Sequence, residues 1–126
     1  MKTILVVDDE PEVVELVRNR LEANGYHVIS ASDGVEGVKK AQKQKPDLII
    51  MDILMPNLQG GDAVKILRTD AATKSIPVIF LTVVIDHMSA GNEIGSVNID
   101  GHFFVAIAKP FKPEQLLIEI EKLVGD

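Results

Sequence analysis

Cysteine is absent from the 126 residues of this sequence, and so is any long apolar run. The first absence excludes disulfide bonds, thiolate metal sites and a cysteine nucleophile. The apolar runs fall well short of the roughly 20 residues that cross a membrane. The run near Met1 is also shorter than the core of a signal peptide, which needs about 7–15 apolar residues. We therefore expect no membrane span, and a cytoplasmic location is compatible with this sequence.

Positive charge is scarce as well, because 13 basic residues face 19 acidic ones and leave a formal net charge of −6. The only basic cluster in the sequence suits the solvated face of a helix better than a nucleic-acid site, so we expect no nucleic-acid partner. Its members are Lys39, Lys40, Lys43 and Lys45. With 46% apolar and 25% charged residues, the chain fits one globular domain over residues 1–126.

Short apolar runs alternate with helical patterns along the chain. The runs are rich in valine and isoleucine without clear alternation, which is typical of strands covered on both faces. They occupy residues 3–7, 27–31, 47–51, 77–81 and 103–108. Helices are predicted over residues 11–25, 34–44, 60–69 and 112–124. In the first of these, Pro11 suits the first turn and Gly25 the left-handed position just past the end. The alternation predicts an α/β fold with a doubly wound parallel sheet and helices on both faces.

Polar residues directly follow four of the expected strands. Asp8 and Asp9 follow the first, Asp52 the third, Thr82 the fourth and Lys109 the fifth. Ligands bind at the carboxyl ends of strands in open parallel sheets, so these groups should meet at one edge. Mg²⁺ prefers oxygen ligands and would neutralise carboxylates that otherwise repel each other. A carboxylate can also accept a phosphoryl group, whose charge a metal, a lysine and a hydroxyl would stabilise.

Each of these residues alone has an ordinary structural explanation. Asp9 could cap a helix, and Asp52 could cap a loop. Thr82 could be a β-branched strand residue, and Lys109 could be a surface lysine. These explanations do not account for the joint occurrence of the residues at the ends of four strands.

The motifs resemble the receiver domain of two-component response regulators over essentially the whole chain. They are VVDDEP with Asp8 and Asp9, DLIIMDILMPNLQG with Asp52, Met55, Pro56 and Gly60, Thr82 after VIFL, and AKPF with Lys109 and Pro110. The resemblance implies a flavodoxin-like sheet of five parallel strands in the order 2-1-3-4-5. It also implies a Mg²⁺-dependent signalling switch, phosphorylated by a sensor histidine kinase or a phosphotransfer protein, and not a metabolic enzyme.

The resemblance also assigns roles to individual residues. Asp52 would be the phosphoacceptor. Asp9 would bind the metal directly, and Asp52 would also belong to the metal site. Asp8 would help through water or at the edge of the site, and the backbone carbonyl of Leu54 would be a further ligand. Lys109 would bind one phosphoryl oxygen and stabilise its negative charge. The peptide bond between Lys109 and Pro110 would be cis, which suits a sharp turn that presents the lysine. Thr82 would hydrogen-bond another oxygen and move when the aspartate is modified.

The sequence departs from the family pattern in the aromatic residue that usually stands three positions before the lysine. That position is Ala106 here. Phe103 or Phe104 could replace the aromatic, or both could be ordinary strand residues. Val83 is bulkier than the small residue that usually follows the threonine, so access to the site should be narrower.

Two further departures lead to predictions. Glycines and asparagines weaken a helix after the fourth strand, so we predict a short or frayed helix and a mobile loop within residues 86–102. Leu54 and Val84 occupy the positions two after Asp52 and two after Thr82. In the family, the side chains at these positions flank the water that attacks the phosphoryl group. Because apolar side chains cannot orient water, we predict slow intrinsic loss of phosphate.

Two other functions stay open at this point. A phosphatase or phosphotransferase of another aspartate-nucleophile family would need a second acid at Leu54 and a cap domain, for which the chain is too short. A degenerate receiver would bind partners without phosphate. The intact acidic and basic residues count against it, whereas Val83 and Ala106 count slightly for it.

Partners are less readable from the sequence. The chain ends directly after the last expected helix, so we expect either a single-domain regulator or a receiver separated from a larger one. Its downstream protein target is unknown, and we expect a monomer or a weak homodimer. Ile118, on the polar side of the last helix, could be a contact or an isolated exposed residue. Three histidines lack metal-ligand spacing, and they are His27, His87 and His102.

Overall fold

The computed structural model describes residues 1–55, 57–82 and 94–125 of the chain. A six-stranded sheet with the strand order β2-β1-β3-β4-β6-β5 forms its centre. The strands are β1 (Thr3–Val7), β2 (His27–Ala31), β3 (Leu48–Asp52), β4 (Val78–Thr82), β5 (Ile94–Ile99) and β6 (His102–Ala108). The helices are α1 (Pro11–Ala23), α2 (Gly34–Gln44), α3 (Gly60–Thr69) and α4 (Pro113–Val124).

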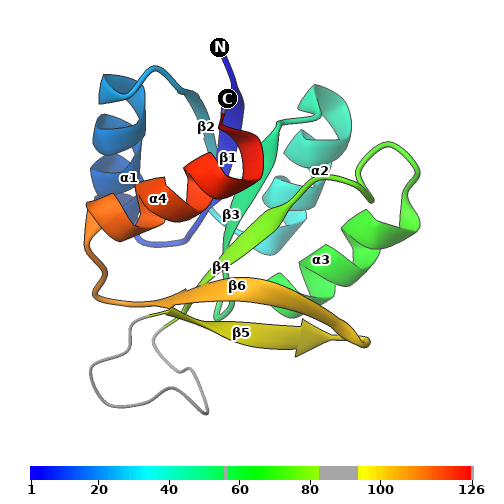
Figure 1. The fold of residues 1–126 in the computed structure, drawn as a ribbon. Coiled ribbons are helices and arrows are strands. Elements are labelled where there is room, and N and C mark those ends of the chain that lie inside the picture. Colours follow the sequence, from blue (N-terminus) through cyan, green and yellow to red (C-terminus); the bar gives the residue numbers. More distant parts are fainter. Residues whose placement is uncertain (56, 83–93, 126) are drawn as a thin grey trace.

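Helices cover both faces of the sheet, as the sequence predicts. Helices α1 and α4 lie on one face, and α2 and α3 lie on the other (Figure 1). Each pair encloses its own apolar core. Val17, Leu21, Leu116 and Ile120 pack in the core on the α1 and α4 side, and Val38, Ala41, Val64 and Leu67 pack in the core on the other side. Strand β3 is buried along its whole length, which explains its unbroken apolar sequence up to Asp52.

The predicted doubly wound arrangement is confirmed. Strands β1 to β4 and β6 pair in parallel, and β6 takes the place of the fifth strand in the expected order 2-1-3-4-5. One strand more is present than the sequence predicts. This sixth strand, β5, pairs antiparallel with β6 at the outer edge of the sheet.

The prediction for residues 86–102 is wrong where the structure describes them. Residues 94–102 form β5, a turn and the start of β6 instead of a frayed helix and a mobile loop, and residues 86–93 lie outside the described residues. The turn consists of Asp100 and Gly101, both with positive φ angles of 50° and 85°. An Asp-Gly pair in this conformation is a typical two-residue hairpin turn. Glycine does disfavour a helix here, but it also favours the hairpin.

Local features at the helix ends agree with the sequence predictions. Pro11 lies at the first turn of α1, and Gly25 follows that helix with a φ angle of 89°. Gly60 begins α3 so close to β3 that a Cβ atom there would lie 2.2 Å from the carbonyl oxygen of Asp52. Only glycine allows this approach. No helix in the described ranges combines the length and apolar character needed to cross a membrane.

Candidate functional site

Parallel strand pairing brings the polar residues named from the sequence to one edge of the sheet. Val7 pairs with Met51, so Asp8 and Asp52 follow neighbouring positions of β1 and β3. Thr82 ends β4 beside Ala108 of β6, and Lys109 follows. Parallel pairing thus brings these residues together at the carboxyl ends of the strands, as the sequence predicts.

Lys109 is the centre of this group. Its Nζ atom lies 2.7 Å from Asp8 Oδ2, 2.9 Å from Glu10 Oε1 and 3.4 Å from Asp52 Oδ2. The lysine side chain is only 9% exposed, and those of Asp8 and Asp52 are 0% and 6% exposed. The alternative that Lys109 is an ordinary surface lysine is therefore wrong.

Burial and charge shift the proton equilibria of two of these groups. Burial raises the pKa of Asp52 to about 6, the charge of Asp8 adds to the rise, and Lys109 offsets part of it. For Lys109, burial alone would lower the pKa, but hydrogen bonds with Asp8 and Glu10 and the charges of Asp8 and Asp52 raise it. The lysine thus stays charged but is shared among three carboxylates. The pKa of Asp52 stays above its ordinary value because burial and the charge of Asp8 outweigh the effect of Lys109.

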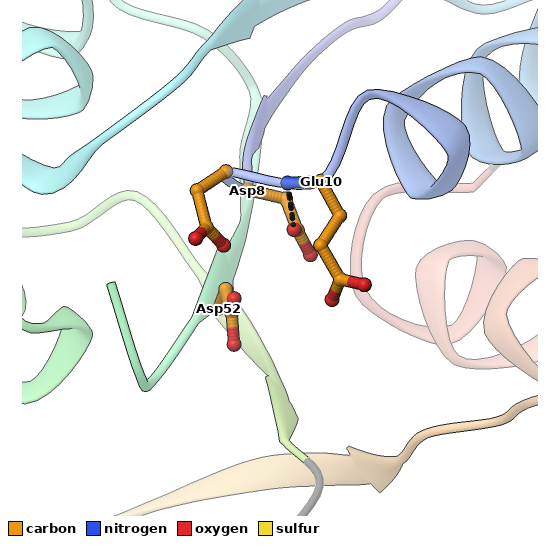
Figure 2. A group of neighbouring side chains, drawn as sticks. Asp8, Glu10 and Asp52 are labelled. Atoms are coloured by element: carbon orange, nitrogen blue, oxygen red, sulfur yellow. Dashed lines mark hydrogen bonds between the residues drawn. The ribbon is translucent and has the colours of Figure 1, made fainter. Parts of the chain in front are cut away.

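The carboxylates fit a divalent cation. Asp8, Asp9, Glu10 and Asp52 each offer an oxygen, and these oxygens lie within 4.8 Å of one another. Figure 2 shows Asp8 and Glu10 on the turn after β1, with Asp52 beside them. The buried Asp8 Oδ2 contacts Lys109 Nζ at 2.7 Å and has no other partner among the described residues. An acceptor in this state, within a set of hard oxygen ligands, suits Mg²⁺.

The turn after β1 is shaped by its own hydrogen bonds. The backbone N–H of Glu10 donates to Asp8 Oδ1 at 2.9 Å. Glu10, not Asp9, is the N-cap residue of α1, and no side chain caps this helix. The alternative that Asp9 serves only as a helix cap is therefore wrong. Its carboxylate is exposed and belongs to the acidic cluster.

Thr82 and Lys109 are the two residues expected to contact the phosphoryl group. Thr82 is only 1% exposed at the end of β4. The peptide bond between Lys109 and Pro110 is cis, as the resemblance implies. Leu54 lies in the loop after β3 and is 49% exposed. Side-chain packing therefore does little to fix its position. Val83 and Val84 lie outside the described residues.

The aromatic position of the family pattern is occupied by a buried alanine. Ala106 is 0% exposed, pairing with Phe80 of β4 and Gly95 of β5. Phe104 packs edge-on against Phe80, with 5.7 Å between ring centroids. Phe103 points outward and is 73% exposed. Phe104 is four residues from Ala108, or about 13 Å along the strand, so neither phenylalanine lies next to Thr82.

Sequence reasoning missed Glu10. Its position directly after two site aspartates was the available signal, but nothing in the sequence shows that its carboxylate turns toward Lys109. The remaining residues singled out from the sequence stay outside the site. His27, His102 and Ile118 are exposed, and His87 lies outside the described residues.

The fold and this edge of the sheet define a doubly wound α/β module with an acidic site at the carboxyl ends of its strands. A family profile described as the response regulator receiver domain matches residues 4–121. The chain therefore belongs to the response regulator receiver domain family. Receiver domains are signalling modules of two-component systems, which accept phosphoryl groups and bind Mg²⁺ at an acidic pocket.

Individual relatives agree with this assignment. The chain is 37% identical over 125 residues to the alkaline phosphatase synthesis transcriptional regulatory protein PhoP of Bacillus subtilis, covering 98% of this chain and 48% of that protein. It is 44% identical over 82 residues to protein PilH of Pseudomonas aeruginosa, covering 65% of this chain and 68% of PilH. The chain thus spans about half the length of several curated relatives that it matches.

Solved structures show the same fold. The Vibrio cholerae chemotaxis protein CheY4 superposes with a TM-score of 0.84 at 31% identity, covering 98% of this chain and 99% of that one. The receiver domain of a sensor histidine kinase from Pseudomonas aeruginosa superposes with a TM-score of 0.83 at 28% identity, covering 99% of this chain and 98% of that one. That neighbour contains a magnesium ion coordinated in its active-site cleft.

Proposed function

We propose that this chain is a single receiver domain over residues 1–126 that works in the cytoplasm as a phosphorylation switch. Asp52 accepts the phosphoryl group from a sensor histidine kinase or a phosphotransfer protein. The modified chain then binds an unidentified downstream protein differently. The observation that carries this proposal is the buried Lys109, which contacts Asp8 and Asp52 at the carboxyl edge of the sheet.

The cation site consists of oxygen ligands from two neighbouring strands. Asp9 and Asp52 would bind Mg²⁺ directly, with the Leu54 carbonyl as a further ligand and Asp8 acting through water. When bound, the cation neutralises charge on the carboxylates and on the phosphoryl oxygens. Its presence would also favour the ionised form of Asp52, whose pKa is raised to about 6 without it.

The transfer step needs an ionised nucleophile and a neutralised phosphoryl group. A carboxylate oxygen of Asp52 forms a bond to phosphorus as the bond between phosphorus and the donor imidazole nitrogen breaks, and the imidazole leaves with the electron pair. Lys109 Nζ already lies 3.4 Å from Asp52 Oδ2, so it can bind a phosphoryl oxygen after a small shift. The Thr82 hydroxyl would hydrogen-bond another oxygen.

The proposal can be tested by intact mass after incubation of the chain with acetyl phosphate. We expect a single phosphoryl adduct that requires Mg²⁺. The adduct should be absent from the Asp52→Ala variant and absent when a chelator removes Mg²⁺. A folded chain without an adduct would contradict this function. It would favour the alternative of a degenerate receiver that binds partners without phosphate.

A further inference from the structure

The loop between β3 and α3 is tied to the start of α2 by a side-chain hydrogen bond. Asn57 Nδ2 donates to Asp33 Oδ2 at 2.8 Å, across 24 residues of sequence. Asn57 has a φ angle of 70°, in the left-handed region that asparagine tolerates better than most residues. The bond therefore joins an unusual backbone position in the loop after Asp52 to a regular element.

Asp33 is a rigid anchor for this bond. It is the N-cap residue of α2, and its Oδ1 accepts the backbone N–H of Glu36 at 2.8 Å. The Glu36 carboxylate in turn accepts the backbone N–H of Ser32 at 2.6 Å. The hydrogen bonds from Glu36 and Asn57 lower the pKa of Asp33, so its carboxylate is ionised and uses one oxygen for each donor.

The same loop also contacts α2 through its backbone. A Cβ atom on Gly34 would lie 2.2 Å from the carbonyl oxygen of Leu58, so only glycine lets the loop approach this closely. The Leu58 side chain packs against the core beneath. Two consecutive loop residues, Asn57 and Leu58, are therefore held against the first turn of α2.

Leu54 has fewer constraints of its own. The backbone N–H of Ile53 donates to the Leu81 carbonyl at 3.1 Å, and the N–H of Gly60 donates to the Ile53 carbonyl at 2.9 Å. Between these anchors and Asn57, the exposed Leu54 side chain contributes little packing. The direction of the Leu54 carbonyl thus depends on these anchors and on the buried Met55 side chain that follows it.

We propose that Asp33 and Asn57 form a brace that holds Asn57 and Leu58 against α2 and thereby helps to position the Leu54 carbonyl for a divalent cation. Both are positioning residues, because neither belongs to the acidic cluster of the site. The inference rests on the proposed function only in placing the cation between Asp9, Asp52 and this carbonyl. Outer groups that orient metal ligands typically change metal affinity about 10- to 100-fold when they are lost.

The test is a Mg²⁺ titration by calorimetry of the full chain and its variants. Asn57→Asp tolerates the same backbone angle but sets two carboxylates against each other, and Asp33→Asn in the same chain restores a donor and an acceptor. We expect Asn57→Asp to weaken the Mg²⁺ Kd about tenfold and the double variant to return to within about twofold of wild type. The added charge of Asn57→Asp alone would tighten Mg²⁺ binding, so a weakened Kd reports positioning.

Asn57→Gly gives a neutral second variant that keeps the positive φ angle without the hydrogen bond. We expect it to weaken Mg²⁺ binding and to speed hydrogen exchange at the Leu54 and Met55 amides. Unchanged Mg²⁺ affinity in both Asn57 variants, with or without a lower Tm, would overturn the brace as a positioning device. Wild-type chain that binds Mg²⁺ but takes no phosphoryl group would contradict the proposed function, while the Kd values still decide the brace.

Discussion

The backbone N–H of Lys109 donates a hydrogen bond to the carbonyl of Thr82, with 2.9 Å between nitrogen and oxygen. The two residues proposed to contact the phosphoryl group are therefore fixed to each other by the parallel pairing of β4 and β6. Their relative position thus belongs to the scaffold rather than to a loop.

The raised pKa of Asp52 leads to a prediction about stability. Its pKa of about 6 in the fold lies above the ordinary value of 3.8, so folding disfavours the charged carboxylate. Without Mg²⁺ at pH 7, Asp52→Asn should raise the free energy of unfolding by about 1–3 kcal/mol. Because the penalty on the wild type is complete only above the folded pKa, the gain should shrink as pH falls from about 6 to 4.

Urea unfolding at pH 7 and at pH 4 would measure this gain in the free energy of unfolding. Asp62→Asn, which removes an exposed carboxylate in the first turn of α3, is the matched control, and it should change stability by less than about 0.5 kcal/mol. Mg²⁺ should narrow the difference between the wild type and Asp52→Asn. A gain that persists unchanged at pH 4 would show that the titration of Asp52 is not its cause.

Glu10 leads to a second prediction, because its carboxylate competes for the lysine of the site. Glu10 Oε1 lies 2.9 Å from Lys109 Nζ, and its side chain is 54% exposed at the mouth of the site. Glu10→Gln should free Lys109 for the phosphoryl group and reduce repulsion of anionic donors. We expect phosphorylation by acetyl phosphate to become roughly two- to fivefold faster.

The control for this variant is Glu12→Gln, which removes an exposed charge from the first turn of α1. It should leave the rate of adduct formation unchanged. If Glu10→Gln slows the reaction, Glu10 supports the site instead of competing for Lys109, and the prediction fails.

The apolar Leu54 leads to a third prediction, which concerns the lifetime of the phosphorylated state. An amide at this exposed position could hold a water near the phosphoryl group through a hydrogen bond of about 1 kcal/mol, so Leu54→Asn should shorten the lifetime roughly fivefold. The decay of the adduct, followed by intact mass, measures it. Leu54→Met is the control, since it keeps the apolar character. Equal lifetimes in all three chains would mean that Leu54 does not flank the attacking water.

The hairpin turn leads to a fourth prediction. Gly101 has a φ angle of 85°, which costs a residue with a Cβ atom about 1–2 kcal/mol. Gly101→Ala should lower the free energy of unfolding by that amount, whereas Asp100→Asn, which suits the same turn, should change it by less than about 0.5 kcal/mol. Thermal unfolding followed by circular dichroism measures both. A neutral Gly101→Ala would contradict the turn geometry.

Much of the fold and site could be predicted because the responsible signals are local. Unbroken Val and Ile runs such as residues 3–7 predict buried parallel strands, and parallel strands place their carboxyl ends together. Asp8, Asp52, Thr82 and Lys109 follow from that rule, without any knowledge of the packing. Helices α2 and α3 begin and end where their patterns predict.

The errors have equally specific causes. In residues 94–102, helix propensity and turn chemistry compete, and the Asp100–Gly101 turn prevails because β6 offers β5 a row of backbone donors and acceptors to pair with. The contacts of Glu10 with Lys109 and of Asp33 with Asn57 join residues 99 and 24 positions apart. Such contacts depend on the assembled sheet and not on a local pattern.

The most direct test of the central claim is to locate the modified residue. Borohydride reduces an acyl phosphate on aspartate to homoserine, and peptide mapping then identifies the position. After treatment with acetyl phosphate and Mg²⁺, homoserine should be found at residue 52 and at neither Asp8 nor Asp9. Homoserine at one of those aspartates, or none in a folded chain that binds Mg²⁺, would contradict the account.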